Sequence, residues 1–196
     1  MARDTRRSIL EATLGLLEQG DGAFTYERLA SAAGVSRQTL YTHFPARADL
    51  LIAAVDHRRG QLGADDLREP ILAAATARDA LHALLDYHLA FTPQIMIPAR
   101  AVEAQRASDP ELSAAFERRS SGRRQTVRHV VTRLRAEGDL RDAWSVDEAT
   151  DLVSALTTAA FTSDLLDERS WTTDQLRDRL LETIQRTLLN EPSPQH

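Results

Sequence analysis

The chain has 196 residues, of which 24 are basic and 29 acidic, so its formal net charge is −5 at pH 7. This length is enough for one large domain or two small ones with a substantial core. Since cysteine is absent, disulfides, thiolate metal sites and cysteine nucleophiles are excluded, and a reducing compartment fits.

Targeting segments are not evident in the sequence. The N-terminus, MARDTRRSIL, is basic but is not followed by a long apolar run, and the longest such run, residues 50–55, is too short to span a bilayer. We therefore expect a soluble, cytoplasmic protein. Residues 1–60 contain 8 arginines and 7 acidic residues, against 16 and 22 in residues 61–196. The acidic excess thus lies downstream, and a nucleic-acid partner for the first part remains compatible with the charge.

Helical periodicity dominates the chain, and we predict an all-α fold. A first helix is expected over about residues 4–18. A short helix capped by Thr25 should end at Gly34, because glycine readily adopts a left-handed backbone. Ser36 caps a second short helix, and a fourth helix follows Pro45 and continues to about residue 60 or 63. This N-terminal three-helix layout is typical of a helix-turn-helix.

The second short helix has one apolar side and a polar surface. Leu40 and Phe44, four residues apart, point to the core, and the remaining side chains can contact base edges and phosphates. Arg37 and Gln38 are the best base readers, since arginine suits guanine and glutamine suits adenine in bidentate geometry. The predicted DNA-binding set is Thr25, Ser36, Arg37, Gln38, Thr39, Tyr41, Thr42, His43 and Arg47, in which Thr25, Tyr41, His43 and Arg47 are expected to fix phosphates.

The order and spacing of these residues resemble the DNA-binding signature of the TetR family of bacterial transcriptional regulators. The resemblance covers roughly residues 5–58, and its marks are Phe24-Thr25, Leu29-Ala30, Ala33-Gly34-Val35-Ser36, Leu40-Tyr41, His43-Phe44 and Asp49-Leu50-Leu51. Arg47 departs from the family, which usually has lysine there, but it keeps a cation at the start of the fourth helix. Beyond residue 60 the resemblance is architectural only.

The resemblance implies a function as well as a fold. It implies a sequence-specific regulator, foremost a repressor, that binds double-stranded DNA at a palindromic operator. A small-molecule effector would bind in the helical body and move the helix 46–60. This movement would change the distance between the two DNA-binding domains of the dimer and so weaken binding to the operator.

Downstream of residue 60 we expect a helical body interrupted by prolines. Residues 65–75 form a short helix or linker. Helices follow over residues 77–91 and 99–107, separated by Pro93 and Pro98.

The rest of the body contains clear helix-capping signals. Asp109-Pro110 opens a long helix that Gly138 ends. A capping box from Ser145 to Glu148 opens a helix to about residue 166, and Thr173 caps the last helix, to about residue 189. The expected domains are a helix-turn-helix domain at 1–46, a connecting helix at 47–63, a ligand-binding and dimerisation domain at 64–190, and a disordered tail at 191–196.

The last two helices have more apolar surface than a terminal hairpin should need. The family resemblance implies that they pair with their copies in a four-helix dimer interface, and ordinary core packing is the alternative. Two recognition helices on a twofold axis can read half-sites one DNA turn apart, ~34–36 Å. The expected interface residues of this homodimer are Leu152, Leu156, Ala159, Leu176, Leu180 and Ile184.

The long helix 109–137 has polar residues in the middle of its apolar stripe. Buried charge is costly unless it is paired, so these residues either line a ligand void or lie on a solvated face. In the first case, an arginine there favours an anionic or carbonyl-bearing effector. The candidate effector contacts are Tyr87, His88, Phe91, Met96, Arg100, Phe116, Ser120, Arg123, Arg124, Val127, Trp144 and Phe161.

We predict no cofactor, metal site or catalytic group. His82 and Asp86 are four residues apart but would supply only two metal ligands. Two alternatives remain open, a non-specific DNA-architectural protein and a helical enzyme. The acidic body argues against the first. The sequence lacks a nucleophile elbow, a phosphate-binding glycine loop and a metal-spaced histidine cluster, which argues against the second.

Overall fold

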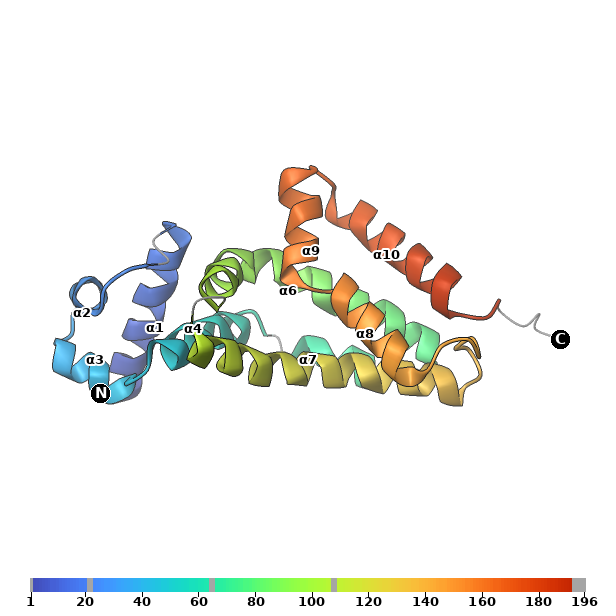
Figure 1. Ribbon diagram of the computed structural model, residues 1–196, viewed down its shortest axis with the longest axis horizontal. Coiled ribbons are helices and arrows are strands. Elements are labelled where there is room, and N and C mark those ends of the chain that lie inside the picture. Colours follow the sequence, from blue (N-terminus) through green and yellow to red (C-terminus); the bar gives the residue numbers. More distant parts are fainter. Residues whose placement is uncertain (1, 21–22, 64–65, 107–108, 192–196) are drawn as a thin grey trace. The chain divides into compact units, whose positions relative to one another are not determined.

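The computed structural model describes residues 2–20, 23–63, 66–106 and 109–191 (Figure 1). The helices are α1 (Ala2–Glu18), α2 (Tyr26–Ala33), α3 (Arg37–His43), α4 (Arg47–Gln61), α5 (Glu69–Ala73), α6 (Ala77–Arg106), α7 (Pro110–Ala136), α8 (Val146–Leu156), α9 (Ala159–Ser163) and α10 (Thr173–Leu188), with a 3-10 turn η1 (Asp66–Arg68) and a π-helical turn η2 (Asp164–Glu168). The all-α prediction is confirmed. In the described ranges, β-structure is limited to an isolated bridge between Leu140 and Leu189.

The chain forms two compact units. The first comprises Met1–Leu62 and Ile95–Arg119, and the second comprises Gly63–Gln94 and Ser120–His196. The long helices α6 and α7 therefore contribute residues to both units. This division differs from the predicted linear order, because the helix-turn-helix, α4 and the segment 95–119 share one core.

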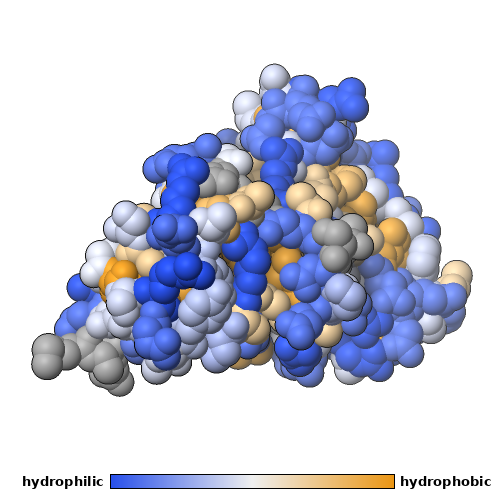
Figure 2. Space-filling model, turned by 60° about the vertical axis from the view of Figure 1, so that its left-hand side comes forward, coloured by the Kyte–Doolittle hydropathy of each residue, from blue (hydrophilic) through white to orange (hydrophobic). Residues whose placement is uncertain are grey.

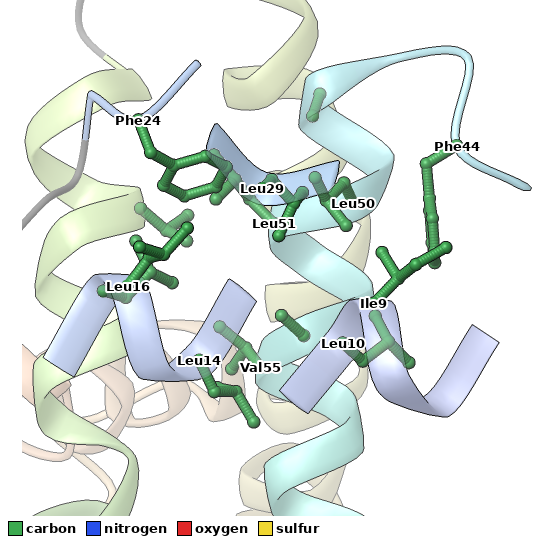
Figure 3. Packing of buried hydrophobic residues seen from close by; sticks show 14 of the residues in the cluster. Ile9, Leu10, Leu14, Leu16, Phe24, Leu29, Phe44, Leu50, Leu51 and Val55 are labelled. Atoms are coloured by element: carbon green, nitrogen blue, oxygen red, sulfur yellow. The ribbon is translucent and has the colours of Figure 1, made fainter. Parts of the chain in front are cut away.

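The core of the first unit is built mainly from α1 and α4. Helix α1 packs against α2 and α4, and α2 packs against α3. Figure 3 shows apolar side chains from these helices converging, with both phenylalanines of the helix-turn-helix segment among them. The labelled residues are Ile9, Leu10, Leu14, Leu16, Phe24, Leu29, Phe44, Leu50, Leu51 and Val55. Val102 of α6 and Leu112 of α7, each at most 1% exposed, belong to the same cluster.

Local capping explains the turn between α2 and α3. The Thr25 hydroxyl accepts a hydrogen bond from Arg28 N at 3.2 Å, and the Ser36 hydroxyl accepts one from Thr39 N at 3.0 Å. Gly34 ends α2 with φ 66°, a left-handed conformation that glycine adopts without steric cost. All three predicted signals are confirmed.

Helix α6 corrects the predicted break at Pro93 and Pro98. The helix runs without interruption from Ala77 to Arg106, although each proline lacks the N–H that a helix interior uses. Leu89 before Pro93, Ile95 between the prolines and Val102 after Pro98 are 5%, 5% and 1% exposed, so the helix is buried on both sides of the prolines. We attribute the continuous helix to this tertiary packing, which offsets the two missing backbone hydrogen bonds.

The predicted helix from 145 to about 166 is also wrong in its length. The capping box of Ser145 and Glu148 is confirmed, but α8 ends at Leu156 and α9 starts afresh, with Thr158 as its cap. Arg123 donates hydrogen bonds to the carbonyls of Ser154 and Thr157, which a continuous helix would use internally. The last helix, in turn, is capped by Thr172 rather than by Thr173, one residue earlier than predicted.

One face of the molecule is predominantly polar. Figure 2 shows a face on which hydrophilic residues predominate and apolar residues form smaller areas between them. Charged residues make up 27% of the sequence, which accounts for this distribution. In the described part of the chain, no helix combines the length and hydropathy that a membrane crossing requires.

Candidate nucleic-acid interface

Helix α3 has a polar outer face and an apolar inner side that is buried in the core. Leu40 is 0% exposed and Phe44 2%, so the helix is seated in the core of the first unit (Figure 3). Arg37 and Gln38 are exposed, and Tyr41 is 44% exposed, unusually high for so large an apolar ring. The predicted division of α3 into an inner and an outer side is confirmed.

Arg37 and Gln38 are available to an external ligand. Among the residues that the structure describes, neither side chain has a hydrogen-bond partner. Arg37 is moreover the first residue of α3, where the positive end of the helix dipole disfavours a cation by ~0.3–1 kcal/mol. An anion bound at this end would contact both the guanidinium and the helix amides, which offsets that cost.

The hydroxyls of this face have local partners. Thr39 Oγ1 lies 2.8 Å from Ser36 Oγ, and Thr42 Oγ1 donates to Gln38 O at 2.9 Å. These bonds hold the side chains in fixed rotamers and leave further lone pairs on each oxygen. His43, at the end of α3, is half-buried. The predicted contacts of these residues and of Thr25 with DNA remain predictions.

Arg47 differs from the polar residues of α3, because its side chain bonds residues of the first unit that are far away in the sequence. Its Nη1 donates to the Phe24 carbonyl at 2.9 Å, and its guanidinium lies 4.3 Å from the centre of the Phe24 ring. The Nε and Nη2 atoms each lie 3.4 Å from Gln105 Oε1. Arg47 therefore ties the start of α4 to the segment before α2, a structural role that the sequence did not predict.

Tyr26 is the residue of this site that the sequence analysis missed. Its hydroxyl donates to Phe44 O at 3.2 Å, and its ring centre lies 4.8 Å from that of Tyr41, with a 50° angle between the planes. Burial raises the pKa of the Tyr26 hydroxyl, and Arg47 opposes this shift. The only signal in the sequence was an aromatic residue directly after a helix cap, which gives no indication of contacts 15 and 18 residues away.

Comparisons with known proteins agree with this geometry. Residues 9–54 match the family model described as bacterial regulatory proteins, tetR family. The structure of NalD, the secondary repressor of the MexAB-OprM multidrug efflux pump in Pseudomonas aeruginosa, has a TM-score of 0.70 and 26% sequence identity, covering 97% of this chain and 98% of that one. The helix-turn-helix segment of the chain, residues 9–54, therefore belongs to the TetR family. The matched residues contain α2, α3 and the outer face just described.

Two further likenesses extend the comparison. A transcriptional regulator from Saccharomonospora viridis, solved in complex with choline, has a TM-score of 0.75 and 22% identity over 95% of this chain and 98% of that one, which shows a shared TetR-type fold. The nucleoid occlusion factor SlmA of Actinobacillus pleuropneumoniae is 30% identical over 91 residues, 43% of this chain. The match spans 45% of SlmA, so the chain covers less than half the length of this relative.

In the second unit, the two adjacent arginines of α7 have different environments. Arg123 Nη1 donates to Ser154 O at 2.8 Å, to Thr157 O at 2.9 Å and to Thr157 Oγ1 at 3.1 Å. Arg124 instead forms an exposed ion pair with Asp151. The sequence left open whether these arginines point into the molecule or lie on a solvated face. Arg123 points inward, and Arg124 lies on a solvated face.

A buried polar cluster lies in the second unit around His88. Its Nε2 lies 2.8 Å from Thr162 Oγ1 and its Nδ1 lies 3.0 Å from Thr92 Oγ1. Burial, with a smaller contribution from Arg123, lowers the pKa of His88 to about 3, so the ring is neutral at physiological pH. The Ser154 hydroxyl is buried too, and within the described ranges it has no hydrogen-bond partner.

The remaining effector candidates do not share one environment. Val127, 1% exposed, and Tyr87, 8% exposed, lie in the core of the second unit, and Trp144 Nε1 donates to Thr187 O at 3.0 Å. Ser120 and Phe161 are half-exposed residues of the same unit, whereas Met96, Arg100 and Phe116 belong to the first unit. The Phe91 side chain lies outside the described residues. Their contacts with an effector remain predictions.

The predicted dimer interface needs a correction in α10. Leu176, Leu180 and Ile184 are 1%, 3% and 1% exposed in the single chain, so they pack within their own unit. An apolar stripe on α10 is therefore core and is not available to a second copy. Leu152, Leu156 and Ala159, on α8 and α9, are half-exposed and remain candidates.

The pair of possible metal ligands that the sequence offered, His82 and Asp86, does not form a metal site in the described structure. Asp86, which could have shared a metal with His82, pairs with Arg177. The described segments bring no three histidine or acidic side chains together in a way that could hold a metal ion.

In the first unit, a cavity of about 370 Å³ lies between α4 and α7, lined by Asp49, Ile52, Ala53, Asp56, Ala115 and Arg118. The sequence did not indicate it.

Proposed function

We propose that the chain is a sequence-specific DNA-binding transcriptional regulator that acts as a homodimer. It represses its target and leaves the operator when a small-molecule effector binds. The observation that supports this function is the outer face of α3, where Arg37 and Gln38 are exposed and unoccupied above the buried anchors Leu40 and Phe44.

The geometry suggests how sequence is read. A side chain at the start of α3 can reach base edges in the major groove when the helix lies in it. We assign Gln38 to an adenine and Arg37 to a guanine, each through a bidentate pair. The amides at the starts of α2 and α3 contact phosphates and fix the register of the domain on the duplex.

One α3 helix reads only a few base pairs, so affinity requires a second copy on a twofold axis. We propose that the α8–α9 face forms this dimer interface. Leu152, Leu156 and Ala159 lie there beside the exposed residues Ala155 and Ala160, all of them apolar. Small side chains allow two helices to approach closely, which suits a symmetric helical interface.

We propose that the effector binds in the body and is recognised by its polar groups at the His88 cluster. Ser154 Oγ offers a buried, unoccupied hydrogen-bonding group, and Arg123 raises the local positive potential. An anionic or carbonyl-bearing effector suits this potential. The S. viridis neighbour was solved with choline, so the same fold also accepts a cationic ligand. Coupling of ~1–3 kcal/mol between effector and operator is sufficient for release.

Selection of bound duplexes from a random pool tests the proposed function. The full-length protein should enrich a palindromic sequence with half-sites about one DNA turn, ~34–36 Å, apart. Gln38→Ala should then relax base preference at one operator position by ~1–3 kcal/mol and leave the other positions unchanged. Salt-dependent binding without any enrichment would instead indicate a non-specific DNA-architectural protein.

A further inference from the structure

Helix α3 has only seven residues, about two turns, and cannot hold its own orientation. Isolated helices shorter than ~12–15 residues are marginal in water, so tertiary contacts must set its direction. Leu40 and Phe44 hold its inner side in the core. Two features of the helix are not part of this inner side, the backbone carbonyl of Phe44 at its carboxyl end and the outer face that carries Tyr41.

Tyr26 contacts both of these features. Its hydroxyl donates to the carbonyl of Phe44, the residue that caps α3, at 3.2 Å. That carbonyl lies beyond the last intrahelical hydrogen bond, so it depends on an outside donor or on water. On the outer face, the Tyr26 ring packs against the Tyr41 ring. The ring centres are 4.8 Å apart and the planes are tilted, and aromatic pairs favour such tilted contacts over face-to-face stacking.

The base of the Tyr26 side chain is itself well anchored. Tyr26 is the first residue of α2, directly after the cap Thr25, and its half-buried ring packs against the core of the first unit. A fixed backbone at one end and two contacts at the other make the side chain a brace between the start of α2 and the end of α3.

We propose that Tyr26 is a positioning residue that sets the angle at which α3 presents Arg37 and Gln38, and hence determines operator selectivity. Tyr26 does not itself need to touch DNA. This inference rests on the proposed function. Bidentate base contacts tolerate little misplacement, whereas phosphate contacts adapt to small shifts, so loss of the brace should weaken specific binding far more than non-specific binding.

The test compares two conservative variants on the full-length protein. Tyr26→Phe keeps the ring and removes only the hydroxyl. Thr13→Val is the matched control, because it removes another hydroxyl-to-carbonyl bond of the same unit, from Thr13 Oγ1 to Ile9 O at 2.8 Å, without touching α3. Dissociation constants are measured on the selected operator and on a scrambled duplex by fluorescence anisotropy, with thermal unfolding of each variant alongside.

For Tyr26→Phe we expect the ratio of specific to non-specific affinity to fall roughly 3- to 10-fold, the effect of one lost hydrogen bond on orientation. Thr13→Val should leave this ratio unchanged at a similar loss of thermal stability. An unchanged ratio in Tyr26→Phe, or an equal fall for both duplexes, would overturn the positioning role.

A second measurement does not depend on DNA. Hydrogen exchange of the amides at residues 40–44 should quicken several-fold in Tyr26→Phe relative to wild type and to Thr13→Val, because the end of α3 opens more often. Equal exchange in all three proteins would contradict the brace. If exchange quickens while the wild-type protein selects no duplex, the brace stands and the proposed function fails.

Discussion

Replacement of Arg123 by methionine should strongly destabilise the second unit, and the same replacement of Arg124 should not. Methionine keeps much of the aliphatic packing and removes the guanidinium. In Arg123→Met, the carbonyls of Ser154, in the last turn of α8, and of Thr157, its C-terminal cap, lose a charged donor. These carbonyls cannot regain helical partners without moving α9.

The size of this loss follows from the hydrogen bonds. A bond from a charged donor contributes ~1.5–3 kcal/mol, and one nitrogen with two hydrogens serves three acceptors. Allowing for water that reaches the half-buried site, we expect a decrease of about 2–4 kcal/mol in the free energy of unfolding. The Arg124 and Asp151 side chains are 43% and 65% exposed, so loss of that ion pair should cost ~0–1 kcal/mol.

Urea unfolding followed by tryptophan fluorescence measures this difference. Both tryptophans, Trp144 and Trp171, lie in the second unit and report its unfolding. With an m-value of about 1.5 kcal/mol/M, a loss of about 3 kcal/mol lowers the midpoint by about 2 M. Equal shifts for Arg123→Met and Arg124→Met would refute the assignment of inward and outward roles.

Three further predictions concern other parts of the chain. Because the pKa of His88 falls to about 3 on folding, its contribution to stability is complete above about pH 6.5. That contribution should decline by about 1.4 kcal/mol per pH unit below pH 6.5. In urea titrations between pH 6.5 and 5, the free energy of unfolding of His88→Gln should not show this decrease with falling pH. The same decrease in the variant and the wild type would contradict the assignment to His88. An added Cβ meets open space at both Gly34 and Gly122, but only Gly34 has a positive φ. In thermal melts, Gly34→Ala should therefore lower the stability of the protein by about 1 kcal/mol, and Gly122→Ala, inside α7, should raise it by a similar amount. Melting-temperature shifts of the same sign in both variants would exclude backbone strain as the cause. Leu156→Glu should yield folded monomers in sedimentation, and an intact dimer would place the interface elsewhere.

Local signals in the sequence were reliable wherever a residue acts on its own neighbourhood. The caps at Thr25, Ser36 and Ser145 each bond a backbone amide three residues ahead. Gly34 likewise ends α2 through its own backbone. Such interactions are complete within one turn of helix, so the residue types and their spacing suffice to predict them.

Longer-range choices could not be predicted in this way. Thr157 and Thr158 do not by themselves end a helix, and the break after α8 depends on an arginine 31 to 34 residues earlier. The prolines of α6 failed to break the helix, which we attribute to the packing of distant residues around them. In both places a tertiary contact outweighed the local preference.

The amino-acid sequence by itself determined that the fold is helical, where the helix-turn-helix begins and ends, and which side of α3 is polar. These properties arise from hydrogen bonds and periodicity within a few residues. Only the tertiary structure decided that Arg123 turns inward while Arg124 does not, that the α10 stripe is covered by its own chain, and that Tyr26 reaches Phe44. The physical reason is that an apolar or polar stripe shows that a face must be covered or solvated, but what covers it depends on residues brought together only by folding.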